Sequence, residues 1–215
     1  IRSCLVGSEM CIRDRCINIK KEFEKKILTK RFSYFWFLKN IPFIVFFIKD
    51  KYNVKKILEI GSYEGLSSNF FLSYYYRSFL YCVDPFIEPS KENYNQNFLT
   101  TEKNFDNNLE DLSSRFKKIK KRSNDFFREL SEKEKFDIIF IDGAHNSESV
   151  YLDAINAWKH LNIRGYMIFD DFFYDEFQNK DDNPIIGIKK FTKKVDNFKI
   201  IALYSQLILQ KKELV

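Results

Sequence analysis

The sequence predicts an α/β domain built on a mostly parallel, seven-stranded sheet that ends in an antiparallel hairpin, with helices on both faces. From residue 55 onward, short apolar runs alternate with amphipathic segments, as in repeated strand and helix units. Several runs are apolar at consecutive positions, which is typical of strands covered on both faces. The last two runs are only about two residues apart, so they must pair as a hairpin.

Seven apolar runs are the expected strands, and they cover residues 56–60, 79–83, 116–120, 136–141, 166–169, 199–204 and 207–210. Residues 146–161 carry apolar side chains at helical spacing and predict a crossover helix. Two further helices are expected to begin near Leu66 and Ile185. Residues 55–215 are therefore expected to form one domain, of a size at which a single core is common.

Two different segments precede the first expected strand. Residues 1–15, IRSCLVGSEMCIRDR, have no helical or strand period and resemble translated vector or adapter read-through, so we expect them to be non-native. Residues 16–54 are expected to form an N-terminal helical extension. Its longest apolar run, residues 41–48, contains Pro42 and is far shorter than the roughly 20 residues of a membrane-spanning helix. We expect the extension to pack on the domain; a membrane-surface or substrate-capping helix is the alternative.

Composition excludes several classes of protein. With 45% hydrophobic and 31% charged residues, the chain is expected to be a soluble globule without a transmembrane segment. The net charge of +6 is modest, and its basic clusters lack the features of a nucleic-acid-binding motif. The four cysteines form no CxxC pair, so we expect no zinc site or disulfide framework, and a cytoplasmic location.

The first expected strand ends in a glycine loop, EIGSYEG, at residues 59–65. In an open parallel sheet, ligands bind beyond the carboxyl ends of the strands. Gly61 permits a tight turn there, and Gly65 permits close approach where the next helix begins. Ser67 and the N–H groups of the helix start can receive a carboxylate. The loop lacks both the GxGxxG pattern of dinucleotide sites and the GK[ST] of a P-loop, so a dehydrogenase is disfavoured.

The second expected strand ends at an acidic residue, Asp84. An acidic side chain in this position can accept hydrogen bonds from both hydroxyl groups of a ribose. Together, the glycine loop and Asp84 favour a cofactor that contains a nucleoside.

Four segments carry a resemblance to a known family, and in chain order they are LEIGSYEG, YCVDPF, FDIIFIDGAHNSESVYLDAINAW and LNIRGYMIFDDF. Over residues 55–211 the chain resembles class I S-adenosylmethionine-dependent methyltransferases, in particular the small-molecule O-methyltransferases of the macrocin and catechol types. The resemblance implies a Rossmann-like methyltransferase domain at residues 55–215. It implies methyl transfer to a hydroxyl of a small molecule, such as a sugar, polyketide or catechol, without naming the acceptor.

By the same resemblance, the residues that would bind S-adenosylmethionine lie at strand ends: Glu59, Gly61, Ser62, Tyr63, Gly65, Ser67, Asp84, Ser123 and Asp142. The glycine loop would line the methionine end of the cofactor, and Asp84 would hold the ribose. Ser123 and its neighbours Arg122 and Asn124 would lie near the adenine.

The resemblance also implies a site for Mg²⁺ or a similar divalent cation, with Asp142, Asp170 and Asp171 as ligands. Carboxylate oxygens suit such an ion, which would lower the pKa of a bound substrate hydroxyl. His145 is implied as the general base, and with Asp142 it forms the expected catalytic pair. Purely structural roles stay open: Asp142 as a loop cap, the Asp170 and Asp171 pair as solvated groups, and His145 as a turn cap.

Two other functions stay open from the sequence. The first is a metal-independent methyltransferase in which His145 or a residue of the long loop after Asp171 does the acid–base work. That loop, residues 172–187, is long enough to act as a substrate lid. The second is a non-catalytic cofactor-binding protein docked through its aromatic N-terminal helix. A homo-oligomer is possible with any of these functions.

Overall fold

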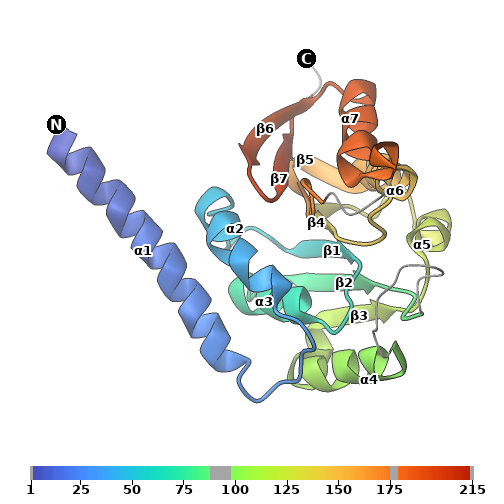
Figure 1. The fold of residues 1–215 in the computed structure, drawn as a ribbon, viewed down its shortest axis with the longest axis horizontal. Helices are drawn as coiled ribbons and strands as arrows, with labels where there is room; N and C mark the ends of the chain where they lie inside the picture. The colour runs from blue at the N-terminus through green and yellow to red at the C-terminus, as the bar shows by residue number, and fades with distance from the viewer. Residues whose placement is uncertain (1, 88–97, 175–178, 214–215) are drawn as a thin grey trace.

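The computed structural model describes residues 2–87, 98–174 and 179–213, and it shows one seven-stranded sheet with helices on both faces (Figure 1). The strands are β1 (Lys56–Ile60), β2 (Phe79–Val83), β3 (Phe116–Ile119), β4 (Phe136–Ile141), β5 (Leu161–Phe169), β6 (Phe198–Leu203) and β7 (Leu207–Lys211). The helices are α1 (Arg2–Lys26), α2 (Ile41–Phe47), α3 (Leu66–Tyr74), α4 (Phe98–Leu109), α5 (Ser123–Glu129), α6 (Ser147–His160) and α7 (Pro184–Lys194). Three 3₁₀ helices are η1 (Trp36–Asn40), η2 (Glu110–Arg115) and η3 (Lys180–Asp182).

The strand order is β3-β2-β1-β4-β5-β7-β6, with β1 to β5 mutually parallel. Strand β7 runs antiparallel to both β5 and β6. The predicted sheet and its C-terminal hairpin are therefore confirmed. The strand order reverses between β1 and β4, so their carboxyl ends form the switch point at which such sheets bind ligands.

Strand β5 begins at Leu161, five residues before the predicted start at 166. Helix α6 ends at His160 because Leu161 already has extended backbone angles, and Leu161 pairs with Phe136 of β4. Asn162, Arg164 and Gly165 interrupt the apolar pattern and hide this first part of the strand from a search for apolar runs.

Consecutive apolar residues of the central strands point to opposite faces of the sheet. In β4, Ile138 and Phe140 pack in a core with α2, α3 and α4, whereas Ile139 and Ile141 pack in a second core with α5, α6 and α7. All four side chains are buried. This double covering is the physical reason why the strands lack an alternating polar pattern.

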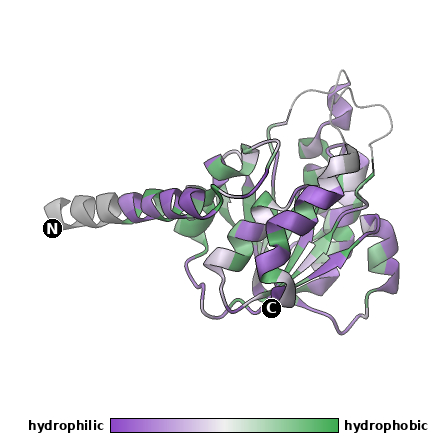
Figure 2. Cartoon of the chain, turned by 90° about the horizontal axis from the view of Figure 1, so that it is seen from below, coloured by the Kyte–Doolittle hydropathy of each residue, from purple (hydrophilic) through white to green (hydrophobic). Residues whose placement is uncertain are grey.

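The N-terminal region has two features that the sequence pattern does not show. Helix α1 continues back to Arg2, through residues that lack a helical period in the sequence (Figures 1 and 2). Residues 27–35 are not helical, so the helical extension is interrupted between α1 and η1. A helix anchored at one end propagates without a new nucleation step, which is why it needs no amphipathic pattern in residues 2–15. The domain boundaries and the non-native origin of residues 1–15 stay predictions.

The extension packs on the domain through both of its helical parts. Phe23 in α1, Ile27 directly after it, and Ile41 and Ile44 in α2 are buried in the same core as Phe70 of α3. The apolar run of residues 41–48 is thus largely a core element. Every helix in the described part of the chain is too short or too polar to cross a bilayer.

Candidate functional site

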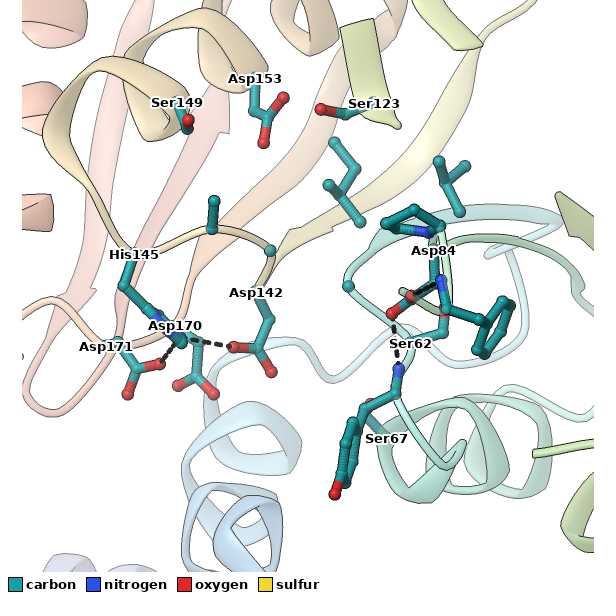
Figure 3. A pocket seen from close by; sticks show the side chains of 18 of the residues that line it. Ser62, Ser67, Asp84, Ser123, Asp142, His145, Ser149, Asp153, Asp170 and Asp171 are labelled. Carbon is teal, nitrogen blue, oxygen red and sulfur yellow. Dashed lines mark hydrogen bonds and ion pairs between the residues drawn. The ribbon is translucent and has the colours of Figure 1, made fainter. Parts of the chain in front are cut away.

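A cavity of about 710 Å³ opens at the carboxyl ends of the parallel strands (Figure 3). Most residues predicted for the site line it: Gly61, Ser62, Tyr63, Ser67, Asp84, Arg122, Ser123, Asn124, Asp142, His145, Asp170 and Asp171. The sequence thus located the cavity through the ends of β1 to β5, although the role of each residue stays a prediction.

The glycine loop at the end of β1 lies directly on the loop that follows β4. Gly61 has a φ of +87°, and a Cβ atom added there would lie 1.9 Å from the carbonyl oxygen of Asp142. No other residue type fits at this point, because both the backbone angle and the space exclude a side chain. The close approach brings the ends of β1 and β4 together, and both ends line the cavity.

Asp84 braces the glycine loop through its carboxylate. The backbone N–H of Tyr63 donates to Asp84 Oδ2 at 2.9 Å, and that of Phe86 donates to Oδ1 at 2.7 Å. Burial raises the pKa of Asp84, and these two hydrogen bonds act in the opposite direction. The carboxylate is therefore fixed in direction, with lone pairs left for a ligand in the cavity.

Two predicted cofactor residues, Glu59 and Gly65, do not line the cavity. Glu59 lies between Leu58 and Ile60 in β1 and points to the opposite face, where its fully buried carboxylate accepts a hydrogen bond from Ser68. Burial raises its pKa to about 7. Gly65 packs closely against side chains of α4. Glu59 and Gly65 therefore contact α3 and α4, and neither residue faces the cavity.

Three acidic side chains and one imidazole meet at the ends of β4 and β5. His145 Nε2 lies 2.9 Å from Asp171 Oδ2 and 3.9 Å from Asp142 Oδ1 (Figure 3). The potential ligand atoms of Asp142, His145 and Asp171 lie within 4.8 Å of one another. Burial, followed by repulsion from Asp170 and Asp171, raises the pKa of Asp142 well above its usual value. A cation at this point would relieve that repulsion.

Asp170 is in a different environment from the other two carboxylates. Its Oδ1 atom accepts hydrogen bonds from the side-chain amides of Asn40 and Gln206, each at 3.0 Å. Ser205 in turn donates to Asn40 Oδ1 at 3.1 Å. Burial and the neighbouring Asp171 raise the pKa of Asp170 to about 6. One Asp170 oxygen thus already has two partners, and Asp170 is not a member of the group that gathers around His145.

Strained backbone conformations also gather at the cavity. Tyr63, Phe86 and Asp171 are non-glycine residues with φ between 46° and 50°, and all three line the cavity. Such residues persist where the surrounding structure holds them, and they cluster at functional sites. This concentration agrees with a functional role for the cavity.

Sequence reasoning missed the aromatic wall that residues 34–37 contribute. Tyr34 and Trp36 line the cavity, and their rings stack at a centroid distance of 4.1 Å. Trp36 is 56% exposed, so its ring is available to a ligand. On the other side, Tyr174 stacks on His145 with ring centroids 4.8 Å apart. High aromatic content throughout the chain concealed Tyr34 and Trp36.

Hydrogen bonds to residues 31 and 33 fix the segment that leads into the aromatic wall. The Glu64 carboxylate accepts hydrogen bonds from the Ser33 hydroxyl at 2.8 Å and from the Asn104 amide at 2.7 Å. Asn108 exchanges hydrogen bonds with both backbone groups of Arg31, at 2.9 Å and 2.6 Å. The segment before η1 is therefore tied to both the glycine loop and α4. The predicted lid is described only in part, because residues 175–178 lie outside the described residues.

Comparison with a family model and with solved structures identifies the fold. A model described as "Methyltransferase domain" matches residues 58–172, which is more than half of the chain. No curated protein matches the chain.

Three solved structures illustrate the likeness. A proposed O-methyltransferase from Klebsiella pneumoniae is 14% identical with a TM-score of 0.63, over 94% of this chain and 90% of that one. MycE, a methyltransferase of the mycinamycin biosynthetic pathway solved with Mg and SAH, is 17% identical with a TM-score of 0.58, over 90% of this chain and 54% of MycE. The O-methyltransferase TomG from Streptomyces achromogenes, involved in tomaymycin synthesis and solved with SAM, is 13% identical with a TM-score of 0.56, over 74% of each chain.

At these identities the solved structures show a shared fold, and the family model supplies the assignment. The matched segment begins in β1 and ends just after Asp171, so it includes the glycine loop, Asp84 and the carboxylates at the ends of β4 and β5. The chain therefore belongs to the methyltransferase domain family.

Proposed function

We propose that the protein transfers a methyl group from S-adenosylmethionine to a hydroxyl of a small molecule. The observation that carries this proposal is the placement of two groups in one cavity: the glycine loop braced by Asp84, and the cluster of Asp142, His145 and Asp171. The printed ligands of MycE and TomG, SAH and SAM, support the choice of cofactor.

In this proposal the cofactor lies along the carboxyl ends of β1 and β2. Asp84 accepts hydrogen bonds from the ribose, and the loop around Ser62 and Tyr63 receives the methionine part. The acceptor hydroxyl lies beside His145, which takes its proton as the methyl group is transferred. Methyl transfer itself needs mainly in-line positioning of the two reactants.

A divalent cation fits the acidic end of the cavity. Asp142 and Asp171 offer hard oxygen atoms within one compact group, and Mg²⁺ prefers such atoms. Asp170 is the third carboxylate of the proposed set, held in direction by Asn40 and Gln206. The ion would supply a lowered pKa for the acceptor hydroxyl. The presence of Mg in the MycE structure supports this choice of ion.

A metal-independent reaction is the second candidate, and the contact of His145 with Asp171 favours it. At 2.9 Å, the carboxylate can orient the imidazole and stabilise its protonated form. The base would then act without an ion.

The acceptor is proposed to be a small molecule because Tyr34, Trp36 and Phe37 of the aromatic wall line the cavity next to the proposed cofactor site. A cytoplasmic location is part of the proposal. In the described part of the chain Cys16 and Cys82 are buried free thiols, as is usual in a reducing compartment. A homo-oligomer also stays a proposal.

Calorimetric titration with S-adenosylhomocysteine, with and without Mg²⁺, tests the cofactor assignment. We expect saturable binding in both conditions, and its absence would contradict the proposed function. Transfer of labelled methyl groups to a panel containing catechol, caffeic acid and a phenyl glycoside then separates the candidates. Loss of transfer in excess chelator supports the metal-dependent reaction, whereas full activity supports the metal-independent one. Binding without transfer to any acceptor points to a non-catalytic protein.

A further inference from the structure

Asp153 in α6 is a buried carboxyl group that the proposed chemistry does not use. Only 3% of the residue is exposed, yet it lines the cavity on the side away from His145 and Asp171 (Figure 3). Within the described part of the chain it has no ion pair. Burial raises its pKa to about 6, and the nearby Ser123 side chain acts in the opposite direction. An ionised carboxylate in such a place needs further hydrogen-bond donors.

Two serine side chains line the cavity together with Asp153. Ser123 begins α5, Ser149 lies one turn before Asp153 on α6, and both line the same cavity. Gly143 presents no side chain, and a Cβ atom there would contact Asp153 Oδ2 at 3.6 Å, so the carboxylate lies close to the Gly143 backbone. The carboxylate therefore faces the cavity next to the backbone that follows β4.

This end of the cavity is where the base of a nucleoside would lie. Asp84, proposed to hold the ribose, and the carboxylates near His145 mark the other parts of the cavity (Figure 3). A base attached to that ribose and directed away from His145 reaches Ser123 and Asp153. The hydrogen-bonding edge of adenine carries a donor, its 6-amino group, and a carboxylate can only accept.

Resting on the proposed function, we propose that Asp153 recognises the adenine of the cofactor by accepting a hydrogen bond from its 6-amino group. Ser123 lines the same part of the cavity, at the start of α5. Hypoxanthine carries an oxygen atom in place of this amino group. That oxygen would face the carboxylate without a proton between them, so the site rejects an inosine cofactor.

The test compares two ligands, S-adenosylhomocysteine and S-inosylhomocysteine, by calorimetry on the full chain at pH 8. We expect the wild-type protein to bind the adenosine compound at least about 100-fold more tightly, because a site built for one hydrogen-bonding pattern leaves polar groups unpaired with the other. In Asp153→Asn the new amide can donate to the oxygen of hypoxanthine, so the preference should fall to about tenfold or less. A carboxylate with a purely structural role would not change the preference between the two bases.

Asp125→Asn is the matched control, because Asp125 also lies near the start of α5 but forms an exposed ion pair with Arg128. Asp125→Asn should prefer S-adenosylhomocysteine over S-inosylhomocysteine by the same factor as the wild-type protein. Equal affinity of the wild-type protein for both ligands overturns the inference even if Asp153→Asn does not fold. An unchanged preference in a folded Asp153→Asn also overturns it. Failure of the wild-type protein to bind S-adenosylhomocysteine contradicts the proposed function itself, which keeps the two failures apart.

Discussion

His145 Nε2 lies 2.9 Å from Asp171 Oδ2, so a side chain that follows β4 and one that follows β5 meet in the cavity. Asp171 holds a φ of 49°, outside the usual range for a residue with a side chain. The contact therefore depends on a strained backbone at the end of β5, which is more typical of a working site than of a solvated pair.

Replacement of His145 tests its proposed role as the base. His145→Ala should lower kcat by roughly 10²- to 10⁴-fold, the usual contribution of a positioned general base. The affinity for S-adenosylhomocysteine should change little, because the proposed cofactor contacts lie at Asp84 and the glycine loop. Turnover that equals the wild-type value from about pH 6 to 8 would remove the assignment.

Removal of the carboxylates tests the proposed metal site. Asp142→Asn and Asp171→Asn should each weaken Mn²⁺ binding, measured by the loss of its free EPR signal, by at least about tenfold, since each removes a charged oxygen ligand. Asp125→Asn serves as the control. Mn²⁺ binding that is the same in all four proteins would exclude a site at Asp142 and Asp171.

Trp36 is expected to contact the acceptor. Trp36→Ala should raise KM for the acceptor by about three- to tenfold, the range expected for one aromatic contact. The Kd of S-adenosylhomocysteine should stay within about twofold. The chain has two tryptophans, so Trp36 is the single indole fluorophore in a Trp158→Phe background. Acceptor binding that leaves this fluorescence unchanged would place the acceptor elsewhere.

Glu59 should make stability depend on pH. Its pKa is raised from 4.5 to about 7 in the folded protein, so the folded state binds its proton more tightly than the unfolded state. The stability that this difference in proton affinity contributes to the folded state is fully present below about pH 4.5 and is lost as the pH rises through about 7. In urea unfolding, the stability of Glu59→Gln relative to the wild-type protein should therefore increase by about 3 kcal/mol from pH 4.5 to 8. A difference that is constant with pH would contradict this account.

Two glycines give a structural contrast. Gly61→Ala should lower the free energy of unfolding by at least about 2 kcal/mol, because the new Cβ requires a left-handed backbone and collides with the Asp142 carbonyl. Gly143→Ala should cost less, since the nearest atom is a methyl group of Ile60 at 3.2 Å. Equal losses in urea unfolding would show that the close approach of the two loops is not the important feature.

The sheet and the strand ends of the cavity could be predicted because their signals are local. A run such as residues 138–141 is apolar on both faces, and Asp84 and Asp142 directly follow such runs. The resemblance to methyltransferases rests on the same segments, which is why it places Asp142 and His145 in one cavity.

Other features depend on contacts between distant segments, so no local pattern predicts them. Asn40 and Gln206 meet at Asp170 although they lie far apart in the chain, and Trp36 reaches the cavity only because residues 27–35 leave the helical path. Glu59 illustrates a different difficulty. Its position in β1 sets the face to which it points, and a motif that includes the residue does not reveal that face.

The bonds from Glu64 to Ser33 and Asn104 have a practical consequence for engineering. Through these bonds, the loop proposed to hold the cofactor and the segment that carries Trp36 fix each other's position. A chimera that takes its N-terminal segment from a relative, in order to accept a new substrate, would lose these bonds. Such a graft would have to carry compatible partners at Glu64, Asn104 and Asn108, so acceptor choice and cofactor affinity would have to be redesigned together.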